Sequence, residues 1–560
     1  MKTLLFFLLF IAVNIFSQSD LPGNLTGNHN TYDFQRGMTV TTNPVPVNPN
    51  YVPDRTIIPV TDNPDSSASS IRYIFNDGAA IGIYCAEAGN GLKSVVGWYL
   101  NNERVSAYGN SNNNPLWEFP EAPQSPLYNN YVGVSTNGNN VADAFFHNIY
   151  SLNGTNGNSN WTFDLTLLPY AVSAGPLAMT SSGNFIVATA NGSSATDSST
   201  VFGFNNSSNV PVWSIRIGPT GTIGSQMYGA KISGNDSLVI VNTYITAYVI
   251  RTYTGQVIYT GTVNPLGNSG TQNSQAISGN GNIIATINYN GYVRVLQWNG
   301  STYNQLWQHQ EPPGTFYNWM TAVDVSNDGS MVACGTLNFR TNSTYDGKVK
   351  LFSVAGGSTP LWTSTGDSDE VNSVAFSKNG RFLCSGSWGS FYTGSAYNLK
   401  VFKTSHITNI PWFKANSPGS FFCSSISDDG QSVIGTGKGV HARQFGNGGM
   451  FYNISIDTSE NPVGININHN IVPDNYALKQ NYPNPFNPST LISYDIPKDG
   501  LVKISIFDVV GREVGILVNK FQKGGRYSAA FDGTNLTSGI YFYKIEASGF
   551  VETKKMILIK

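Results

Sequence analysis

The sequence predicts an all-β protein, with a β-propeller followed by a C-terminal Ig-like antiparallel β-sandwich. Three observations support this fold class. A unit of short apolar strands and glycine turns recurs along most of the chain, the residues from 476 onward have a different strand pattern, and only 11% of residues are charged. Low charge with abundant Gly, Asn, Ser, Thr and aromatic residues favours strands joined by polar turns over long surface helices.

The N-terminus has the pattern of a secretory signal peptide over residues 1–18. Lys2 precedes an apolar run from Leu4 to Phe16, and small or polar residues follow the run. A membrane-spanning helix needs about 20 apolar residues, so this run is short for one and we expect cleavage; a membrane anchor is the alternative. Residues 19–68 form a Pro- and Asn-rich N-terminal segment. The signal predicts a secreted or outer-surface protein that passes through the periplasm.

An internal repeat begins after this segment. Each copy has an apolar strand, a Ser or Thr, polar residues, a turn Gly and a second apolar strand. The eight copies are Tyr73–Gly78, Val134–Gly138, Met179–Gly183, Ile232–Asp236, Ile277–Gly281, Val325–Gly329, Phe376–Gly380 and Ile426–Gly430. Asn-Gly and Asp-Gly pairs accept the positive φ of a tight hairpin, and Asp236 replaces the glycine in one copy. Each copy therefore predicts the first hairpin of a four-stranded unit.

An aromatic residue comes late in every unit, where we expect the fourth strand. These residues are Trp117, Trp161, Trp213, Tyr259, Trp307, Trp362, Trp412 and Tyr452. Units that recur about every 45 to 60 residues are the signature of a β-propeller, here over residues 69–457. We expect the aromatic rings to pack one blade against the next. Eight blades is the count, and seven, with one unit split or degenerate, is the alternative. The units resemble WD-repeat-like and quinoprotein-like propellers.

A polar linker over residues 458–475 separates the repeats from a tail over residues 476–560. The tail opens with Asn-Tyr-Pro-Asn-Pro-Phe-Asn-Pro from Asn481 to Pro488, where three prolines fix φ and remove backbone donors. Alternating apolar segments follow it, and they predict the strands of a small sandwich. The segments are 491–496, 501–508, 513–518, 527–531, 540–547 and 551–559.

The tail closely resembles the type A C-terminal sorting domain of type IX secretion. The resemblance rests on the opening run, on Phe531-Asp-Gly533, on Ser538-Gly-Ile-Tyr-Phe-Tyr543 and on the final lysines. It implies export across the outer membrane of a Bacteroidetes-type cell by the type IX machinery, with removal of the tail by a sorting peptidase. The family motif falls on Asn481, Tyr482, Pro483, Asn484, Pro485, Phe486, Asn487, Pro488, Asp532, Gly533, Ser538, Gly539, Tyr541 and Lys555.

No residue pattern indicates catalysis, a metal ion or a cofactor. The six histidines have no ligand spacing, and neither a nucleophile elbow nor a zinc-protease motif occurs. No Lys/Arg run would track a phosphate backbone, so nucleic acid is not an expected partner. The four cysteines are Cys85, Cys334, Cys384 and Cys423. An oxidising compartment permits disulfides, but buried thiols are the favoured interpretation and the pairing stays open.

Long aromatic loops around the sixth and seventh units give one hypothesis about binding. Rings among Asn, Ser and Thr suit a glycan or a peptide, because rings stack on apolar faces while amides meet hydroxyls. The candidate ligand-binding residues are Trp319, Phe339, Tyr345, Trp388 and Tyr392. The alternative is that these rings fill blade edges.

We therefore expect a secreted or cell-surface propeller for binding or scaffolding, with an extracellular glycan or protein as its partner. The alternative is a secreted propeller enzyme, either a quinoprotein-like oxidoreductase or a glycan-degrading enzyme. Paired carboxylates at the channel mouth would favour the enzyme.

Overall fold

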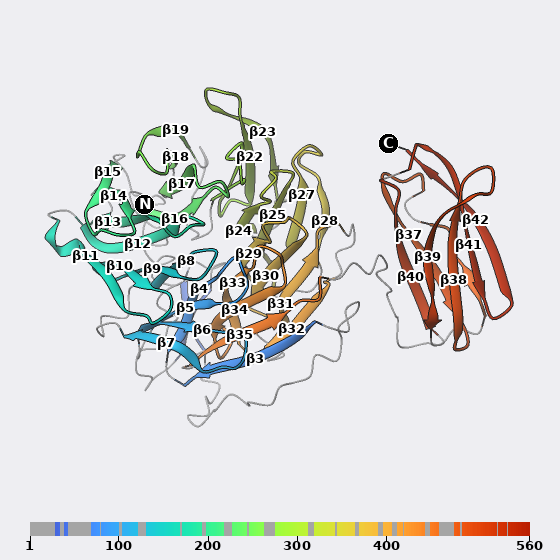
Figure 1. The fold of residues 1–560 in the computed structure, drawn as a ribbon, viewed down its shortest axis with the longest axis horizontal. Helices are drawn as coiled ribbons and strands as arrows, with labels where there is room; N and C mark the ends of the chain where they lie inside the picture. Colours follow the sequence, from blue (N-terminus) through green and yellow to red (C-terminus); the bar gives the residue numbers. More distant parts are fainter. Residues whose placement is uncertain are drawn as a thin grey trace. The chain divides into compact units, whose positions relative to one another are not determined.

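The computed structural model divides the chain into two compact units, one containing Ser69–Ile456 and one containing Asp457–Lys560 (Figure 1). Before residue 69 only the backbone of a hairpin is described, β1 (His29–Asp33) with β2 (Met38–Thr42). After residue 69 the description omits 79, 100–102, 121–129, 169–170, 193–197, 218–226, 244–245, 263–274, 312–317, 342–343, 365–368, 390–395, 406–410, 418, 443–447, 459–474, 482–483, 523–524, 535 and 560. The expected signal peptide and nearly all of the expected linker lie outside the described residues.

The first unit consists of antiparallel sheets, here called blades 1 to 8, with strands A to D from the inside outwards. Blade 1 consists of β4 (Ile81–Glu87), β5 (Ser94–Tyr99), β6 (Arg104–Tyr108) and β7 (Pro115–Pro120), and blade 2 of β8 (Asn130–Val134), β9 (Asn140–Phe145), β10 (Asn148–Asn153) and β11 (Ser159–Asp164). Blade 3 consists of β12 (Ala171–Met179), β13 (Phe185–Gly192), β14 (Ser199–Asn205) and β15 (Pro211–Ile217), and blade 4 of β16 (Met227–Ile232), β17 (Leu238–Thr243), β18 (Thr246–Arg251) and β19 (Val257–Thr262).

Blade 5 consists of β20 (Gln275–Ile277), β21 (Ile283–Ile287), β22 (Tyr292–Trp298) and β23 (Tyr303–Gln310), and blade 6 of β24 (Asn318–Val325), β25 (Met331–Thr341), β27 (Val349–Ser353) and β28 (Pro360–Thr363). Blade 7 consists of β29 (Val371–Phe376), β30 (Phe382–Ser387), β31 (Ala396–Lys403) and β32 (Phe413–Ser417), and blade 8 of β33 (Ser420–Ile426), β34 (Ser432–Lys438), β35 (Gly449–Ser455) and β3 (Ser70–Asp77). Blade 6 carries an extra strand, β26 (Thr344–Asp346), which pairs with β25.

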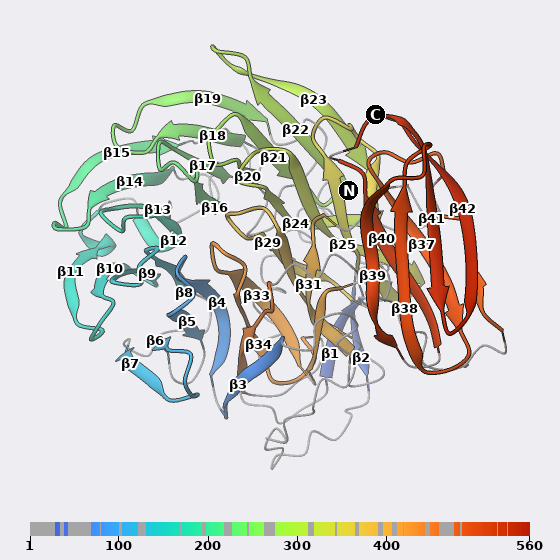
Figure 2. The same ribbon diagram turned by 45° about the vertical axis from the view of Figure 1, so that its right-hand side comes forward.

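The blades form a closed ring (Figure 2). Each inner strand contacts the inner strand of the next blade, in the order β4, β8, β12, β16, β20, β24, β29 and β33, and β33 contacts β4. The expected β-propeller is therefore confirmed, and the described residues give eight blades. Because each chain segment runs outwards from A to D, the D–A and B–C connections share one face of the ring. That face is called the loop face, and the opposite one the turn face.

The ring is closed by a strand from its N-terminal end. β3 pairs with β35 from Ser70↔Ser455 to Asp77↔Gly449, and so becomes strand D of blade 8. The expectation that Tyr73–Gly78 forms the first hairpin of blade 1 is wrong, because β3 and β4 belong to different blades. The corresponding turn of blade 1 lies between β4 and β5, with Gly91 at φ +66°. The shared blade removes two sheet edges that would otherwise be exposed.

The repeated Ser-x-Asx-Gly sequence forms the A–B turns on the turn face. In blade 5, the Ser278 hydroxyl donates to Asn280 Oδ1 (2.9 Å) and accepts from the Ile283 N–H (3.0 Å). Asn280 Oδ1 also accepts from the Asn282 N–H, so both polar side chains satisfy the backbone of the turn. The same arrangement begins at Ser135, Ser233, Ser326, Ser377 and Ser427.

The glycine of this motif has the expected positive φ. Gly281 has φ +77° and Gly430 has φ +81°, a region in which glycine has no Cβ penalty. Asp236, which replaces the glycine in blade 4, adopts the same region with φ +60°. The sequence-based expectation for these turns is confirmed.

Among the described residues, hydrogen bonds join the A–B turns of neighbouring blades at seven of the eight junctions, and at the junction of blades 6 and 7 the bond joins the inner strands β24 and β29. In order from blade 1 they are Asn90 N–H to Thr136 O, Thr136 N–H to Ser181 O, Ser181 N–H to Asp236 Oδ1, Asn235 N–H to Gly279 O, Gly279 N–H to Asn327 O, Phe376 N–H to Asp324 Oδ2, Asn379 N–H to Asp428 O, and Asp428 N–H to Gly89 O. Their donor–acceptor distances lie between 2.7 and 3.0 Å. We call this series the turn ring.

Most of the expected aromatic residues lie on strand D and contact the next blade. The indoles of Trp117, Trp161, Trp213 and Trp307 each donate to a backbone carbonyl in the C–D turn of the following blade, at 2.8 to 3.0 Å. Tyr452 is an exception, because it lies on β35, strand C of blade 8. Its place is taken by Tyr73 on β3, whose hydroxyl donates to Gly109 O of blade 1 (2.5 Å).

Removing a strand-D ring is expected to weaken the contact between two blades. Trp362, 6% exposed, packs on Phe402 of blade 7 at 4.9 Å between ring centroids. Trp362→Ala should lower the free energy of unfolding by about 3–5 kcal/mol, as for other buried aromatic rings.

A pair of Phe variants separates packing from hydrogen bonding. Trp117→Phe should cost more than Trp362→Phe, because Trp117 Nε1 donates to Gly154 O while Trp362 Nε1 has no acceptor among the described residues. Denaturant unfolding of the full chain measures both. Equal losses of free energy of unfolding in the two variants would show that the Trp117 hydrogen bond does not contribute to stability.

A buried polar network connects blade 8 to blade 1. Arg72 on β3 donates to Asn453 Oδ1 (2.7 Å), the Asn453 amide donates to the Ser94 hydroxyl, and Ser94 donates to Glu87 Oε2 (2.6 Å). Burial raises the pKa of Glu87 from 4.5 to about 7, and the hydrogen bonds and Arg72 only partly oppose this. The closure thus contains a carboxyl group that holds its proton more tightly than the unfolded chain does.

The raised pKa of Glu87 makes stability depend on pH. Its contribution is fully present below pH 4.5 and is lost as the pH rises to about 7, because the folded state then has to ionise a buried group. Glu87→Gln keeps the shape of the side chain without the charge. The free energy of unfolding of the variant should exceed that of the wild type by about 2–4 kcal/mol at pH 8, and this difference should shrink toward pH 4.5. Parallel stability curves between pH 4.5 and 8 would contradict this assignment.

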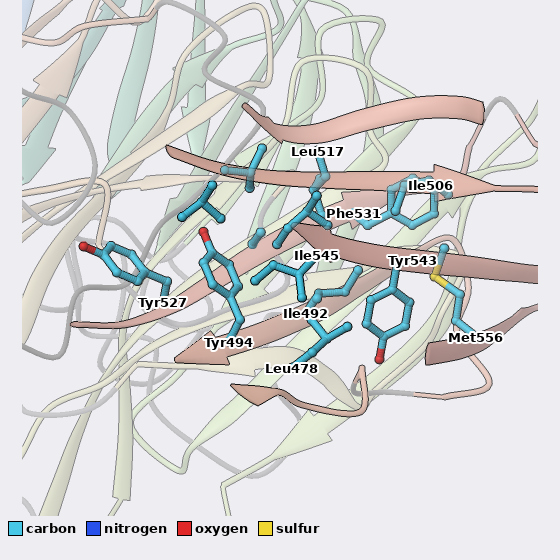
Figure 3. Packing of buried hydrophobic residues seen from close by; sticks show 14 of the residues in the cluster. Leu478, Ile492, Tyr494, Ile506, Leu517, Tyr527, Phe531, Tyr543, Ile545 and Met556 are labelled. Atoms are coloured by element: carbon cyan, nitrogen blue, oxygen red, sulfur yellow. The ribbon is translucent and has the colours of Figure 1, made fainter. Parts of the chain in front are cut away.

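The second unit is a two-sheet sandwich. One sheet is β36 (Ala477–Leu478), β37 (Ser489–Ile496) and β40 (Gly525–Asp532), and the other is β39 (Glu513–Gln522), β38 (Gly500–Phe507), β41 (Gly539–Ala547) and β42 (Phe550–Leu558). All six expected strands are present. Buried residues of both sheets, such as Ile492, Tyr494, Tyr543 and Ile545, form one core (Figure 3).

Candidate functional sites in the tail and on the loop face

The proline-rich opening of the tail runs beside the last strand, β42. Asn484 Oδ1 accepts from the Ile557 N–H (2.9 Å), the Phe486 N–H donates to Ile557 O (2.9 Å), and Phe486 O accepts from the Ile559 N–H (2.9 Å). Phe486 also forms a parallel bridge with Leu558, and only 2% of its surface is exposed. The opening run therefore joins the first and last segments of the sandwich.

Asn481 fixes the start of this run inside the sandwich. Its N–H donates to the Tyr543 hydroxyl (2.8 Å), and its side-chain amide donates to Thr490 Oγ1 (2.9 Å). The Tyr543 hydroxyl in turn donates to Lys479 O (2.9 Å). A buried polar side chain needs such partners, which explains why an Asn can be only 1% exposed here.

Gly533 packs against the opening run. Its N–H donates to Pro488 O (2.8 Å). A Cβ at this position would lie 3.0 Å from the Leu558 side chain and 3.3 Å from the Phe486 ring. The close approach favours glycine, while the neighbouring Asp532 carboxylate caps the turn by accepting from the Thr534 N–H (2.8 Å).

The remaining motif residues are divided between core and surface. Tyr541 is buried and its hydroxyl donates to Thr537 O (2.8 Å), whereas the side chains of Pro485, Asn487, Ser538 and Lys555 are exposed. Tyr482 and Pro483 lie outside the described residues. Some residues of the family motif therefore pack inside the sandwich and close it, and the others lie on its surface.

On the loop face, the structure describes two of the five candidate ligand-binding side chains. Trp319 opens β24 and is half-buried, with its ring 4.3 Å from that of Tyr289. Trp388 follows β30 and is half-buried, edge-on to Phe422 at 6.2 Å. Both therefore lie on the loop face and each packs against a second ring.

Phe339 and Tyr345 are cross-strand partners in the extension formed by β25 and β26, although their side chains are outside the described residues. Tyr392 lies outside the described residues altogether. The extension is specific to blade 6, where β25 is 11 residues long. The binding role of all five residues stays a prediction.

Buried polar residues that sequence reasoning missed lie beside Trp388. The Trp388 N–H donates to Glu370 O (2.9 Å), and its carbonyl accepts from the Ser420 hydroxyl (2.7 Å). His441 Nε2 lies 3.4 Å from Asp369 Oδ2, with both side chains at most 3% exposed. These groups come from blades 7 and 8 and are far apart in sequence, so no spacing could have revealed them.

Among the described residues, no group of three or more His, Cys, Asp or Glu side chains is placed to hold a metal ion. The described part of the chain also has no helix with the length and hydrophobicity of a membrane span.

Two protein families match parts of the chain. Residues 480–560 match the secretion system C-terminal sorting domain. The tail is a type IX sorting domain. It directs the chain out of the cell, either to the surface or into the medium. Residues 358–391 match the WD domain, G-beta repeat, so the first unit is a WD-like propeller. No curated protein matches the chain.

The two matches agree with the geometry. The sorting-domain match starts at Gln480, immediately before the run that seals β42. The WD match begins next to strand D of blade 6 and ends after strand B of blade 7. The matched family repeat therefore runs from strand D of one blade into strands A and B of the next, and is offset by one strand from the blade.

Proposed function

We propose that the chain is a secreted or cell-surface binding protein, in which the sorting domain delivers a propeller that recognises an extracellular glycan or protein through its loop face. The observation that carries the binding proposal is the pair of half-buried tryptophans, Trp319 and Trp388, on neighbouring blades of that face. Tryptophan is the side chain most enriched at binding hot spots, and half-burial fixes the ring while leaving part of it accessible.

The surroundings of Trp388 support a rigid binding platform. Its backbone is tied to blade 7 through Glu370 and to blade 8 through Ser420. Ser420 Oγ also accepts from the Ala442 N–H (2.8 Å), so three connections meet behind the ring. A preorganised aromatic side chain loses little conformational entropy on binding, which favours affinity.

The enzyme alternative would need reactive groups that a substrate can reach. Two acid–base pairs are described toward this face, His441 with Asp369 and His309 with Glu311, and all four side chains are at most 16% exposed. That placement favours a structural role. The enzyme therefore stays the second hypothesis, with no residue assigned to it.

The sorting part of the proposal includes passage through the periplasm and removal of the tail by a sorting peptidase. Deleting residues 476–560 should leave a folded propeller in the periplasm, because the core of each unit is formed from its own residues. Cell fractionation with an antibody to the propeller measures the distribution, and Lys520→Ala, an exposed change in the tail outside the family motif, controls for expression. Normal amounts of the truncated chain in the medium would exclude a requirement for the tail.

Trp388→Ala should weaken glycan or protein binding by about 1–3 kcal/mol, as for a hot-spot ring. Binding can be followed by affinity electrophoresis against a panel of purified polysaccharides and by pull-down with mucin glycoprotein. Tyr253→Ala is the matched control, because Tyr253 is an aromatic side chain, 48% exposed, in a C–D turn of the turn face. The platform would be ruled out if both variants bound a retained probe like the wild type, or if Tyr253→Ala alone lost binding.

A further inference from the structure

Two cysteines from opposite ends of the propeller sequence meet where the ring closes. Cys85 lies on β4, the inner strand of blade 1, and Cys423 lies on β33, the inner strand of blade 8. The Cys423 thiol donates to Cys85 O at 3.5 Å, so the side chain of one cysteine contacts the backbone of the other. All four cysteines are present as thiols in this structure.

The two thiols differ in their surroundings. Cys85 is 8% exposed, and burial raises the pKa of its thiol well above the usual value. Cys423 is half-buried, and its interactions with Cys85 lower the pKa of its thiol. Because the thiolate is the nucleophile in disulfide exchange, Cys423 is the group that reacts first.

We propose that Cys85 and Cys423 form a disulfide during export, which covalently closes the propeller ring. The inference rests on export into an oxidising compartment, which the sorting domain provides. The oxidant is a disulfide carrier, such as a thiol–disulfide oxidoreductase. The Cys423 thiolate attacks the carrier disulfide and releases one carrier thiol; the Cys85 thiolate then attacks the mixed disulfide and releases the second. Two protein thiols thus become one disulfide, and the carrier gains two electrons and two protons.

The other two cysteines have different partners. The Cys384 thiol lies in strand B of blade 7, fully buried, and contacts the Ser424 hydroxyl at 3.6 Å. Cys334 is fully buried in blade 6, where Glu311 and Lys350 are its charged neighbours. Among the described residues, neither thiol hydrogen-bonds to the backbone of another cysteine, as the Cys423 thiol does.

A disulfide at this position would link the two blades between which the ring closes. The two cysteines are 338 residues apart, and closing so long a loop is entropically costly in the unfolded chain. A crosslink restricts that unfolded state. The crosslink would also hold blades 1 and 8 together if the β3–β35 ladder frayed.

The test begins with exported protein collected from the medium, where free thiols are blocked at once with an alkylating agent. The expected result is an intact mass lower by two hydrogen atoms than that of the same protein with Cys85 and Cys423 as free, unalkylated thiols. A crosslinked peptide pair containing Cys85 and Cys423 is also expected. A second arm treats purified, reduced full chain with glutathione disulfide and is independent of export. Oxidation should slow unfolding in denaturant by about tenfold or more, and dithiothreitol should reverse the effect.

Variants assign the effect to this pair. Cys423→Ser should unfold at the same rate with and without glutathione disulfide, whereas Cys334→Ala and Cys384→Ala should retain the difference between the two states. The comparison within each variant removes any loss of stability caused by the substitution itself. Alkylation of both Cys85 and Cys423 in exported and in glutathione-treated protein, or a crosslink between Cys384 and Cys423, would overturn the proposal.

Discussion

The propeller depends on the turn ring, the series of hydrogen bonds that joins the A–B turns of neighbouring blades. Each bond is worth only about 1 kcal/mol, but a bond of this series occurs at each of the eight junctions, so neighbouring blades are held together on the turn face all around the ring. This explains the repeated Ser-x-Asx-Gly sequence. The Ser and Asx side chains satisfy the turn internally, and they leave the backbone groups of the second position, such as Thr136 and Gly279, free to bond outwards.

The turn ring separates the two faces of the propeller. On the turn face, strand-D tryptophans such as Trp117 and Trp161 donate a hydrogen bond to a carbonyl in the C–D turn of the next blade. The repeated residues therefore hold neighbouring blades together there. On the loop face no comparable series of repeated bonds occurs among the described residues. Connections there differ in length from blade to blade, and the β25–β26 extension is one result. A face that does not have to hold the ring together can vary its side chains, which is the condition for a binding surface on a rigid scaffold.

The sequence was sufficient for the parts of the fold that repeat. Glycine turns, strand-D aromatics and the strands of the tail were predictable because each depends on local backbone chemistry, and even the positive φ of Asp236 followed from its place in the repeat. The blade that is shared between the two ends of the propeller sequence was not predictable, since a periodic sequence has the same pattern wherever counting starts. Tyr73 and Tyr452 were misplaced for that reason. The polar groups behind Trp388 were missed because they come from separate blades and have no common spacing.

Both units are sealed by pairing an early segment with a late one. In the propeller, β3 adds to β35, and in the tail the Asn484–Phe486 segment bonds to the end of β42. Neither pairing is possible until the late strand has been synthesised. For the sorting domain this has a functional consequence, because the residues that define its family, such as Asn484, Phe486 and Gly533, are the ones that close the sandwich around β42. A chain truncated before β42 lacks the partner of its own opening run, so the folded sorting domain, with its exposed motif residues in place, requires β42.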